Sequence, residues 1–479
     1  MNRPRTFSEC LTAVAIIAVA AATAGAQSTS APRQTQPAAD VLPRYRLHVG
    51  QKLVYESTAT SQAGSAPASY RIETQRTFWV TRRNSDGGWR MVMLDVARQS
   101  RMQDGKPAGR PQTAKMLVQF DLHEDGRVLG KALNDQRVNL TTVFPRLPGT
   151  RDAAAGWSGP ATAGGTTRYK AAPSTQPGAW TFTGVDDGPL SRIYEIRQQT
   201  TYVFDLARGL VVHSESRSQQ GRGGNAAGLE TTRLVSEQSE KPEWVEPFDR
   251  QADIYFQATD AYDQAFRDVR PGTQRVEARL ADAHAAFQAA AGGVTIPVLA
   301  EAIQDRLARH SQSVQAALRN LQERSKMVNK PAADWTAFDF AGRSHSLKDY
   351  RGKVVVMDFW FRGCSWCILA MPQLKQLAAD FAGKPVAILG MNVDSDPADG
   401  QFVIDALELN YTNLRAEGLP QRYDVQGFPT MIIVDGRGVV RDVRLGFEPD
   451  LREGIGRTIE ALLAEHGAAG SQAGPGPRP

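Results

Sequence analysis

The feature that most limits the fold of this chain is an apolar run that leads directly into a pair of cysteines. The run, Val354–Trp360, is interrupted only by Asp358, and Cys364 and Cys367 follow it with two residues between them. An apolar run of this length predicts a strand that is buried on both faces, as in the centre of a helix-covered sheet. The residues from Cys367 to Phe381 predict a helix, so we expect the cysteines at a strand–helix junction.

Strands and helices continue to alternate after this junction. Further elements are predicted, in order, as a buried strand at 385–393, a helix at 399–409, a hairpin at 430–445 and a last helix at 451–465. This alternation predicts a mixed α/β domain over residues 331–466. The low-complexity end, 467–479, is expected to be a disordered tail.

Residues 41–245 show a different pattern, in which β-branched and aromatic runs are separated by turn residues. Tyr70–Val80 and Trp89–Leu94 flank the turn cluster Asn84–Gly88, which predicts a hairpin. Similar signals recur up to Ser214. We expect an antiparallel β domain, and its sequence does not indicate what it binds.

Residues 246–330 change to a helical period. Phe248, Tyr255, Tyr262 and Phe266 recur at spacings of seven, seven and four, which predicts one face of an amphipathic helix. Two further helices are predicted before residue 330. The aromatic stripe is interpreted as a packing surface rather than a binding face.

The N-terminus has the layout of a secretory signal peptide over residues 1–26. Arg3 and Arg5 precede the apolar run Leu11–Ala22, and the small residues of Ala24–Ala26 fit a cleavage site. The run is short for a membrane span, which needs about 20 residues. We therefore favour cleavage over a retained anchor, and expect an extracytoplasmic protein, periplasmic or secreted.

Removal of this segment changes the cysteine count. The chain has three cysteines, and Cys10 lies in the segment, so Cys364 and Cys367 would remain in a compartment where disulfides persist. Residues 27–40 are polar and predict a flexible linker. No other apolar run is long enough for a membrane span. The net charge of +5 comes without long Lys or Arg runs, so no nucleic-acid partner is expected.

Three kinds of chemistry are open to the cysteine pair. A zinc site usually needs four ligands, and neither a second cysteine pair nor a nearby histidine cluster accompanies it. A purely structural disulfide across two residues would close a tiny loop and add little stability. A redox pair fits better, because the start of a helix favours a thiolate at Cys364, and Cys367 can then attack a mixed disulfide. No metal and no cofactor is expected.

The segment Gly352–Leu374 resembles the active-site region of the thioredoxin superfamily, and more closely that of the exported TlpA/ResA-like thiol-disulfide oxidoreductases. The resemblance covers about residues 331–465 and includes the strand and helix inserted at 385–409. Gln426–Thr430 is similar to the cis-proline loop of the family. The resemblance implies a thioredoxin-like fold, with protein thiols and disulfides as partners and an upstream electron donor.

The resemblance also implies a role for individual residues. Cys364 would be the attacking thiolate and Cys367 the resolving thiol. Pro429 would be the cis-proline beside the disulfide, and the backbone of Phe428 would help to hold a substrate strand. Asp358 would be a buried acid with a raised pKa that relays a proton to or from Cys367. The alternative for Asp358 is a hydrogen-bonded core carboxylate without a kinetic role.

Several positions depart from the family pattern. Gly363 stands where a tryptophan usually precedes the first cysteine, and Trp366 lies between the cysteines instead, where we expect it to contact substrate. Ala370 replaces a glutamate that is common in TlpA/ResA-like proteins, which leaves proton transfer to the buried aspartate or to water. Phe361 stands where peroxiredoxins carry a Thr or Ser, so peroxidase activity is not expected.

Two functional hypotheses follow. The first is an exported oxidoreductase that reduces or isomerises protein disulfides by exchange at Cys364 and Cys367. The alternative is a surface binding or scaffold protein that uses a thioredoxin-like module as an interaction element. A cysteine pair that cycles between oxidation states supports the first, and a pair that resists reduction in the folded protein supports the second.

Overall fold

The computed structural model describes residues 42–62, 69–103, 106–129, 140–150, 152–160, 165–174, 176–221 and 227–472. The expected signal peptide, 1–26, and the expected linker, 27–40, lie outside these residues. The chain falls into two compact units that divide between Asp253 and Ile254, within helix α2 (Pro242–Arg267). Among the described residues, no helix combines the length and apolarity that a membrane crossing requires.

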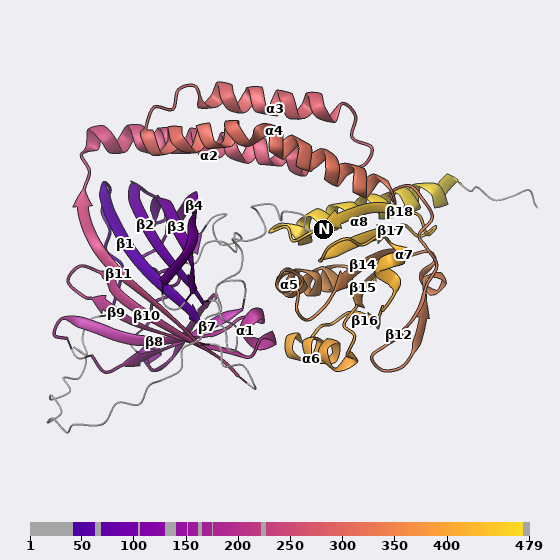
Figure 1. Ribbon diagram of the computed structural model, residues 1–479, viewed down its shortest axis with the longest axis horizontal. Coiled ribbons are helices and arrows are strands. Elements are labelled where there is room, and N and C mark those ends of the chain that lie inside the picture. The colour runs from indigo at the N-terminus through magenta and orange to yellow at the C-terminus, as the bar shows by residue number, and fades with distance from the viewer. Residues whose placement is uncertain are drawn as a thin grey trace, which may run out of the picture. The chain divides into compact units, whose positions relative to one another are not determined.

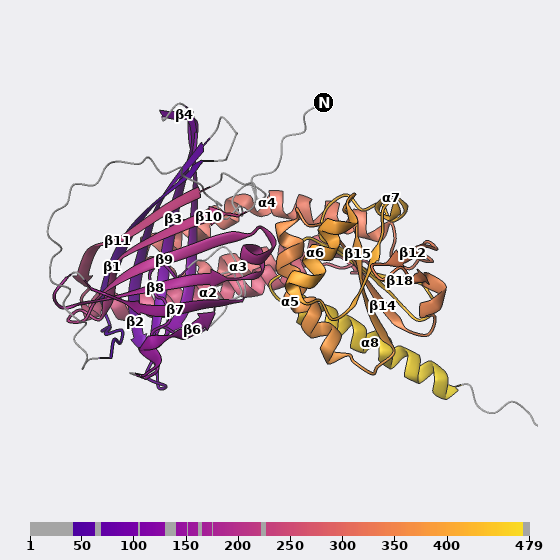
Figure 2. The same cartoon turned by 90° about the horizontal axis from the view of Figure 1, so that it is seen from below.

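The N-terminal unit is built on one antiparallel sheet of eleven strands (Figures 1 and 2). Two meanders, β1–β5 and β6–β11, join where β1 pairs with β11. The elements are β1 (Gln51–Gln62), β2 (Ser69–Arg83), β3 (Trp89–Gln103), β4 (Lys106–Leu122), β5 (Val128–Leu129), η2 (Asp152–Ala155), β6 (Trp157–Pro160), β7 (Thr166–Ala172), β8 (Ala179–Asp187), α1 (Pro189–Ile193), β9 (Ile196–Asp205), β10 (Leu210–Gln220) and β11 (Ala227–Ser239). The expected antiparallel β architecture is thereby confirmed.

The core of this unit lies on one face of the sheet. Phe144, from the segment between β5 and η2, packs edge-on against Tyr45 and Phe78, with ring centroids 5.5 and 5.1 Å apart. Tyr55 and Phe120 complete this aromatic cluster and are at most 2% exposed. The alternation of apolar and polar residues along the strands therefore serves to bury one face.

The first half of α2 packs on the same unit. The ring of Phe248 lies 5.3 Å from that of Trp79 on β2, and Trp244 contacts both rings. Phe248, Tyr255 and Tyr262 are buried, which is consistent with a packing stripe.

The C-terminal unit begins with helices. The second half of α2 is followed by α3 (Val276–Ala291) and α4 (Pro297–Ser325), which completes the three helices expected in this region. The buried side chain of Arg324, at the end of α4, donates to Asp442 at 2.8 Å and to the carbonyl of Val269 at 3.2 Å. This buried ion pair joins α4 to the sheet that follows.

The rest of the unit is a seven-stranded sheet in the order β13-β12-β16-β15-β14-β17-β18. Most of its strands are labelled in Figure 1. The elements are β12 (Thr336–Asp339), β13 (Ser344–Ser346), η3 (Leu347–Tyr350), β14 (Val354–Trp360), α5 (Ser365–Asp380), β15 (Val386–Asn392), α6 (Pro397–Leu407), β16 (Thr412–Arg415), α7 (Leu419–Arg422), β17 (Thr430–Val434), β18 (Val440–Leu445) and α8 (Leu451–Gln472). The order of β sheet, helices and α/β sheet along the chain is the expected one.

Strand β14 lies at the centre of this sheet. It pairs in parallel with β15 and antiparallel with β17, and all seven of its residues are buried. Val356 faces a core that includes Leu374 from α5 and Ile455 from α8, while Met357 faces a second core on the other side. A strand covered on both faces has to be apolar throughout, which explains the run in the sequence.

Several helix ends differ from the sequence-based expectation, and α6 spans Pro397–Leu407 rather than 399–409. Helix α5 begins at Ser365 rather than Cys367, because Cys364 is its N-cap. Helix α8 continues to Gln472, so 467–472, expected to belong to a disordered tail, is helical. The sequence has no proline between Pro449 and Pro475 that would end this helix earlier. Residues 473–479 lie outside the described chain.

Candidate active site

Cys364 and Cys367 form a disulfide at the start of α5, with their Cα atoms 5.3 Å apart. Cys364 is the N-cap residue, and its sulfur accepts a hydrogen bond from the backbone N–H of Cys367 at 3.1 Å. Cys364 is 7% exposed and Cys367 is 0% exposed. Cys364 is thus the less buried of the two cysteines.

The loop that holds the cysteines is fastened to the inserted segment. The backbone N–H of Arg362 donates to both carboxylate oxygens of Asp394, at 3.1 and 3.0 Å. Its guanidinium donates to Asp399 at 2.7 Å and lies 4.3 Å from the ring centroid of Phe402. Sequence reasoning did not single out Arg362. The signal available was an arginine in the cysteine loop and acidic residues after the next strand.

The cysteine loop also meets the loop around Pro429. The peptide bond between Phe428 and Pro429 is cis. The ring of Phe428 packs edge-on against Phe361, with centroids 5.2 Å apart. Gly446 donates its backbone N–H to the carbonyl of Pro429 at 2.8 Å, which ties the loop to the end of β18. The structure therefore brings together the two loops that the sequence placed far apart.

The departures from the family pattern have a packing explanation. A Cβ atom at Gly363 would lie 2.9 Å from the ring of Phe361, so this ring fills the space beside the first cysteine. Trp366 stacks on Phe447 with ring centroids 5.5 Å apart. We call Phe361, Phe428, Trp366 and Phe447 the aromatic rim. Phe447 was not predicted, because it follows β18 and only the fold brings it to Trp366.

Asp358 lies in the centre of β14 and is 0% exposed. Neither carboxylate oxygen has a hydrogen-bond partner among the described residues. Burial raises the pKa of Asp358 to about 8, because a charged carboxylate is disfavoured away from water. Ala370 is fully buried in the core between α5 and the sheet, where a family glutamate would have brought a second acid.

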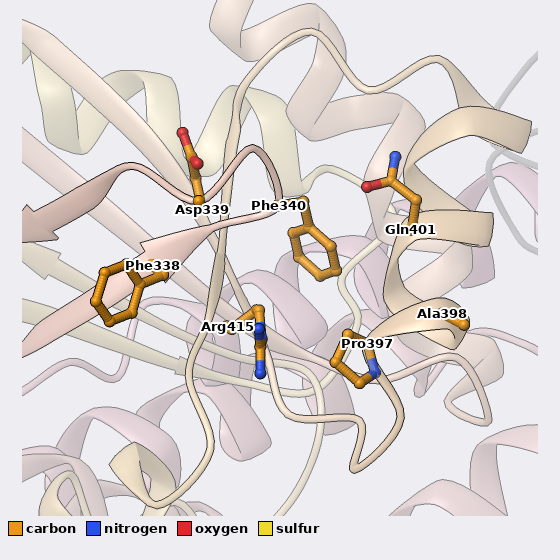
Figure 3. A pocket seen from close by; sticks show the side chains of 8 residues that line it. Phe338, Asp339, Phe340, Pro397, Ala398, Gln401 and Arg415 are labelled. Carbon is orange, nitrogen blue, oxygen red and sulfur yellow. The ribbon is translucent and has the colours of Figure 1, made fainter.

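A separate hollow of about 440 Å³ lies between β12 with the turn after it, α6 and the end of β16 (Figure 3). It is lined by Phe338, Asp339, Phe340, Gly342, Pro397, Ala398, Gln401 and Arg415. None of these residues belongs to the cysteine loop or the cis-proline loop. Exchange between sulfurs of two proteins requires an accessible sulfur rather than an enclosed cavity, so we place the site at the cysteines.

No three histidine, cysteine, aspartate or glutamate side chains of the described residues come together in a way that could hold a metal ion.

Comparisons with known proteins concern this same part of the chain. Residues 328–443 match the model of the AhpC/TSA family. The thioredoxin-like protein YneN of Bacillus subtilis is 30% identical over 119 residues, which are 24% of this chain and 69% of that protein. The thiol-disulfide oxidoreductase ResA of Geobacillus thermodenitrificans is 30% identical over 121 residues, which are 25% of this chain and 70% of that protein.

Among solved structures, the thioredoxin domain of a thiol-disulfide oxidoreductase from Bacteroides vulgatus is 29% identical, with a TM-score of 0.26. The aligned part is 28% of this chain and 97% of the solved Bacteroides vulgatus chain. The relatives that align over two thirds of their length are a thioredoxin-like protein and a thiol-disulfide oxidoreductase. Through its C-terminal part, this chain therefore belongs to the ResA/TlpA-like members of the thioredoxin superfamily, and it is an oxidoreductase.

Proposed function

We propose that this protein reduces or isomerises disulfides of other proteins by dithiol–disulfide exchange at Cys364 and Cys367. The observation that carries the proposal is the pair itself. Cys364 sits at a helix N-cap with its sulfur on a backbone N–H, and Cys367 is fully buried behind it. One reachable sulfur and one covered sulfur suit an attacking and a resolving role.

The substrate would lie across the aromatic rim. Among the described residues, the backbone N–H and C=O of Phe428 have no partner within the protein, so both are open to an extended substrate strand. Pro429, fixed in the cis form, holds this backbone beside the cysteine loop through the contact of Phe428 with Phe361. Trp366, stacked on Phe447, offers an apolar surface on the cysteine loop for neighbouring side chains of the substrate.

The first step is attack on the substrate disulfide. The Cys364 thiolate forms a bond to one substrate sulfur, the substrate disulfide breaks, and the other substrate sulfur leaves as a thiolate. The N–H of Cys367 and the positive end of the α5 dipole stabilise the Cys364 thiolate before the attack.

The second step releases the substrate. Cys367 gives its proton to Asp358 and attacks the Cys364 sulfur, which restores the Cys364–Cys367 disulfide and frees the second substrate thiolate. The substrate has then gained two electrons and the enzyme pair has lost two. A dithiol donor must reduce the pair again by the same chemistry in reverse.

Peroxide reduction is not the favoured function despite the family model. Phe361 stands three residues before Cys364, and its ring packs against Phe428 and the space beside Gly363. An aromatic ring there supplies no hydrogen bond to a peroxide. We expect no hydrogen peroxide consumption above that of a Cys364→Ser variant.

We place this activity outside the cytoplasm, after cleavage of the bond between Ala26 and Gln27. The support is the charged, apolar and small-residue pattern of residues 1–26 and the location of both other cysteines beyond it. N-terminal sequencing of the protein purified from its host tests the cleavage, and an intact Met1 in the mature protein would contradict it.

Trapping tests the exchange itself. In a Cys367→Ser variant the first step proceeds and the second cannot, so we expect a covalent mixed disulfide between Cys364 and substrate proteins on non-reducing gels. A Cys364→Ser variant should trap nothing. Insulin reduction in the presence of dithiothreitol provides the activity readout, and equal rates for wild type and the double cysteine variant would refute the proposal.

A further inference from the structure

Asp358 is accompanied by a second buried polar group that also lacks a partner. Tyr411, just before β16, is half-buried as a residue, but its hydroxyl oxygen is buried. Neither this hydroxyl nor either oxygen of Asp358 has a hydrogen-bond partner among the described residues. Buried polar groups in folded proteins almost always have a partner, so two orphans on one sheet face need an explanation.

The register of the sheet places the two groups near each other. Asp358 on β14 pairs with Gly390 on β15, and Gly390 pairs with Asn413 on β16. Tyr411 precedes Asn413 by two residues and packs on the same core as Val356, the neighbour of Asp358 along this face of β14. Across the sheet, Gly390 is the one residue between Asp358 and Asn413.

Gly390 cannot be replaced without a clash. A Cβ atom there would lie 1.9 Å from Oδ1 of Asn413 and 2.9 Å from Nε1 of Trp360. Asn413 accepts from this indole nitrogen at 3.2 Å and donates to the carbonyl of Tyr411 at 2.9 Å. The glycine makes room for an amide that fixes the backbone of Tyr411.

The surroundings of Asp358 are otherwise apolar. Ala370 and Leu374 from α5, Met431 from β17 and Ile455 from α8 belong to the core on its side of the sheet. No charged group from these elements or from β15 acts on Asp358. Burial and the nearby Asp358 raise the pKa of Tyr411 well above its ordinary value, so the phenol keeps its proton and remains a donor.

We propose that Tyr411 is a positioning residue for proton transfer, whose hydroxyl donates a hydrogen bond through one water to the ionised Asp358 carboxylate, while Asp358 takes the proton from Cys367. The inference rests on the proposed function and deepens it. Tyr411 does not touch the reacting sulfurs. It acts on the aspartate, which it holds ready as a proton acceptor.

A donor that favours the charged form of an acid makes that acid a proton acceptor at lower pH. Without the hydroxyl, Asp358 would ionise only at higher pH. The ionised fraction of Asp358, which accepts the proton of Cys367 in the resolving step, would then be smaller near neutral pH. The attack by Cys364 would be unaffected.

A two-phase reaction separates these steps. Reduced enzyme mixed with one equivalent of 5,5′-dithiobis(2-nitrobenzoate) releases one thionitrobenzoate when Cys364 attacks and a second when Cys367 resolves the mixed disulfide. In Tyr411→Phe we expect an unchanged first phase and a pH midpoint of the second phase raised by roughly one unit. At pH 7 the second phase should be up to about tenfold slower.

Two variants serve as controls. Tyr423→Phe removes another buried hydroxyl, on the opposite face of the sheet, where it donates to the carbonyl of Ala333 at 2.6 Å. It should leave the pH midpoint unchanged. In an Asp358→Asn background, Tyr411→Phe should have no further effect, because the group it acts on is gone.

The outcomes are distinguishable. Absence of the first phase in wild type overturns the proposed function. This inference alone is overturned by a different result, in which the first phase is normal and the pH midpoint of the second phase disappears in Asp358→Asn but is unchanged in Tyr411→Phe. The infrared carbonyl stretch of protonated Asp358 gives an independent readout, and an identical band in wild type and Tyr411→Phe also contradicts the inference.

Discussion

Two carboxylates, one from each sheet of this protein, have opposite surroundings. In the N-terminal unit, Asp95 on β3 accepts from Arg76 on β2 at 2.9 Å, and both side chains are 13% exposed or less. The same guanidinium donates to Thr142 at 3.2 Å. In the C-terminal unit, Asp358 is fully buried and has no partner among the described residues.

The difference separates a paired carboxylate from an unpaired one. A buried ion pair with hydrogen bonds on both members is a stable arrangement that resists change. A lone buried carboxyl is held neutral over part of the pH range and can accept or release a proton in the range where enzymes work. The unpaired group lies in the strand that leads to the cysteines, and the paired one lies in the sheet that has no cysteine.

The largest expected effect comes from Asp358→Asn. In the folded protein, Asp358 keeps its proton up to a pKa of about 8, while the unfolded chain releases it near 4. The folded state binds more protons across this window, so wild-type stability falls as pH rises from 4 to 8 and is then flat. The variant lacks this loss and should be more stable above pH 8, by at most about 5 kcal/mol.

Hydrogen exchange of β14 and β17 amides as a function of pH measures this difference. The slope should be confined to the C-terminal unit, and the amides of β2 and β3 serve as the internal control. Parallel pH profiles for wild type and Asp358→Asn would contradict the raised pKa.

A slightly smaller effect of the opposite sign is expected for Arg76→Ala. The change leaves Asp95 buried without its partner, which should destabilise the N-terminal unit by roughly 3–5 kcal/mol. Thiol exchange at the cysteines should be unaffected, as long as the protein is folded.

Replacement of both charges, as Arg76→Met with Asp95→Leu, is the matched control. It should recover most of the stability, because no uncompensated charge remains. Urea unfolding followed by exchange of the β1–β3 amides provides the measurement. If the double variant were as unstable as Arg76→Ala, the lost stability could not come from an uncompensated charge on Asp95 alone.

Gly390→Ala tests how the backbone at Gly390 supports the surroundings of Asp358. The new methyl group would force Asn413 aside and break its bond with Trp360, so we expect a loss of roughly 1–3 kcal/mol. The displaced Tyr411 should also shift the pH profile of the second thionitrobenzoate phase. Gly342→Ala tests for a general effect of glycine replacement, because its Cβ would meet nothing within 4 Å, although its φ of +82° adds local strain. It should leave that pH profile unchanged.

The smallest effect is expected at the aromatic rim. Trp366→Ala removes the stack on Phe447 and should lower kcat/KM for insulin by about tenfold, which corresponds to about 1.4 kcal/mol. Reaction with 5,5′-dithiobis(2-nitrobenzoate) should change less, because a small disulfide does not need the rim. An equal loss for both substrates would show that Trp366 acts on the cysteines rather than on substrate binding.

The central strands and the long helices around the cysteines could be predicted, whereas the short elements β12, β13, β16 and α7 were not. The apolar runs of the predicted elements have the length and period of buried strands and amphipathic helices, and these are local properties. Cys364 and Cys367 were assigned to a strand–helix junction on the same grounds. The family resemblance supplied Pro429 and the role of Asp358, which no periodicity could have given.

The N-terminal unit was less predictable. Hairpins such as the one at Asn84–Gly88 follow from local turn signals. The pairing of β1 with β11, which joins two meanders into one sheet, is a contact between the ends of the unit. Nothing in either strand specifies its distant partner, so the number of sheets could not be stated.

The sequence by itself therefore determined the place of the cysteine pair at the start of a helix and the burial of Asp358, because each depends on residues within one strand, loop or helix. The tertiary structure decided which side chains surround the pair. Tyr411 lies just before β16, Phe428 just before β17 and Phe447 just after β18, and these segments meet through a strand order that differs from the order in the chain. That order arises from the packing of whole strands and helices, so only the folded molecule brings Tyr411 to Asp358.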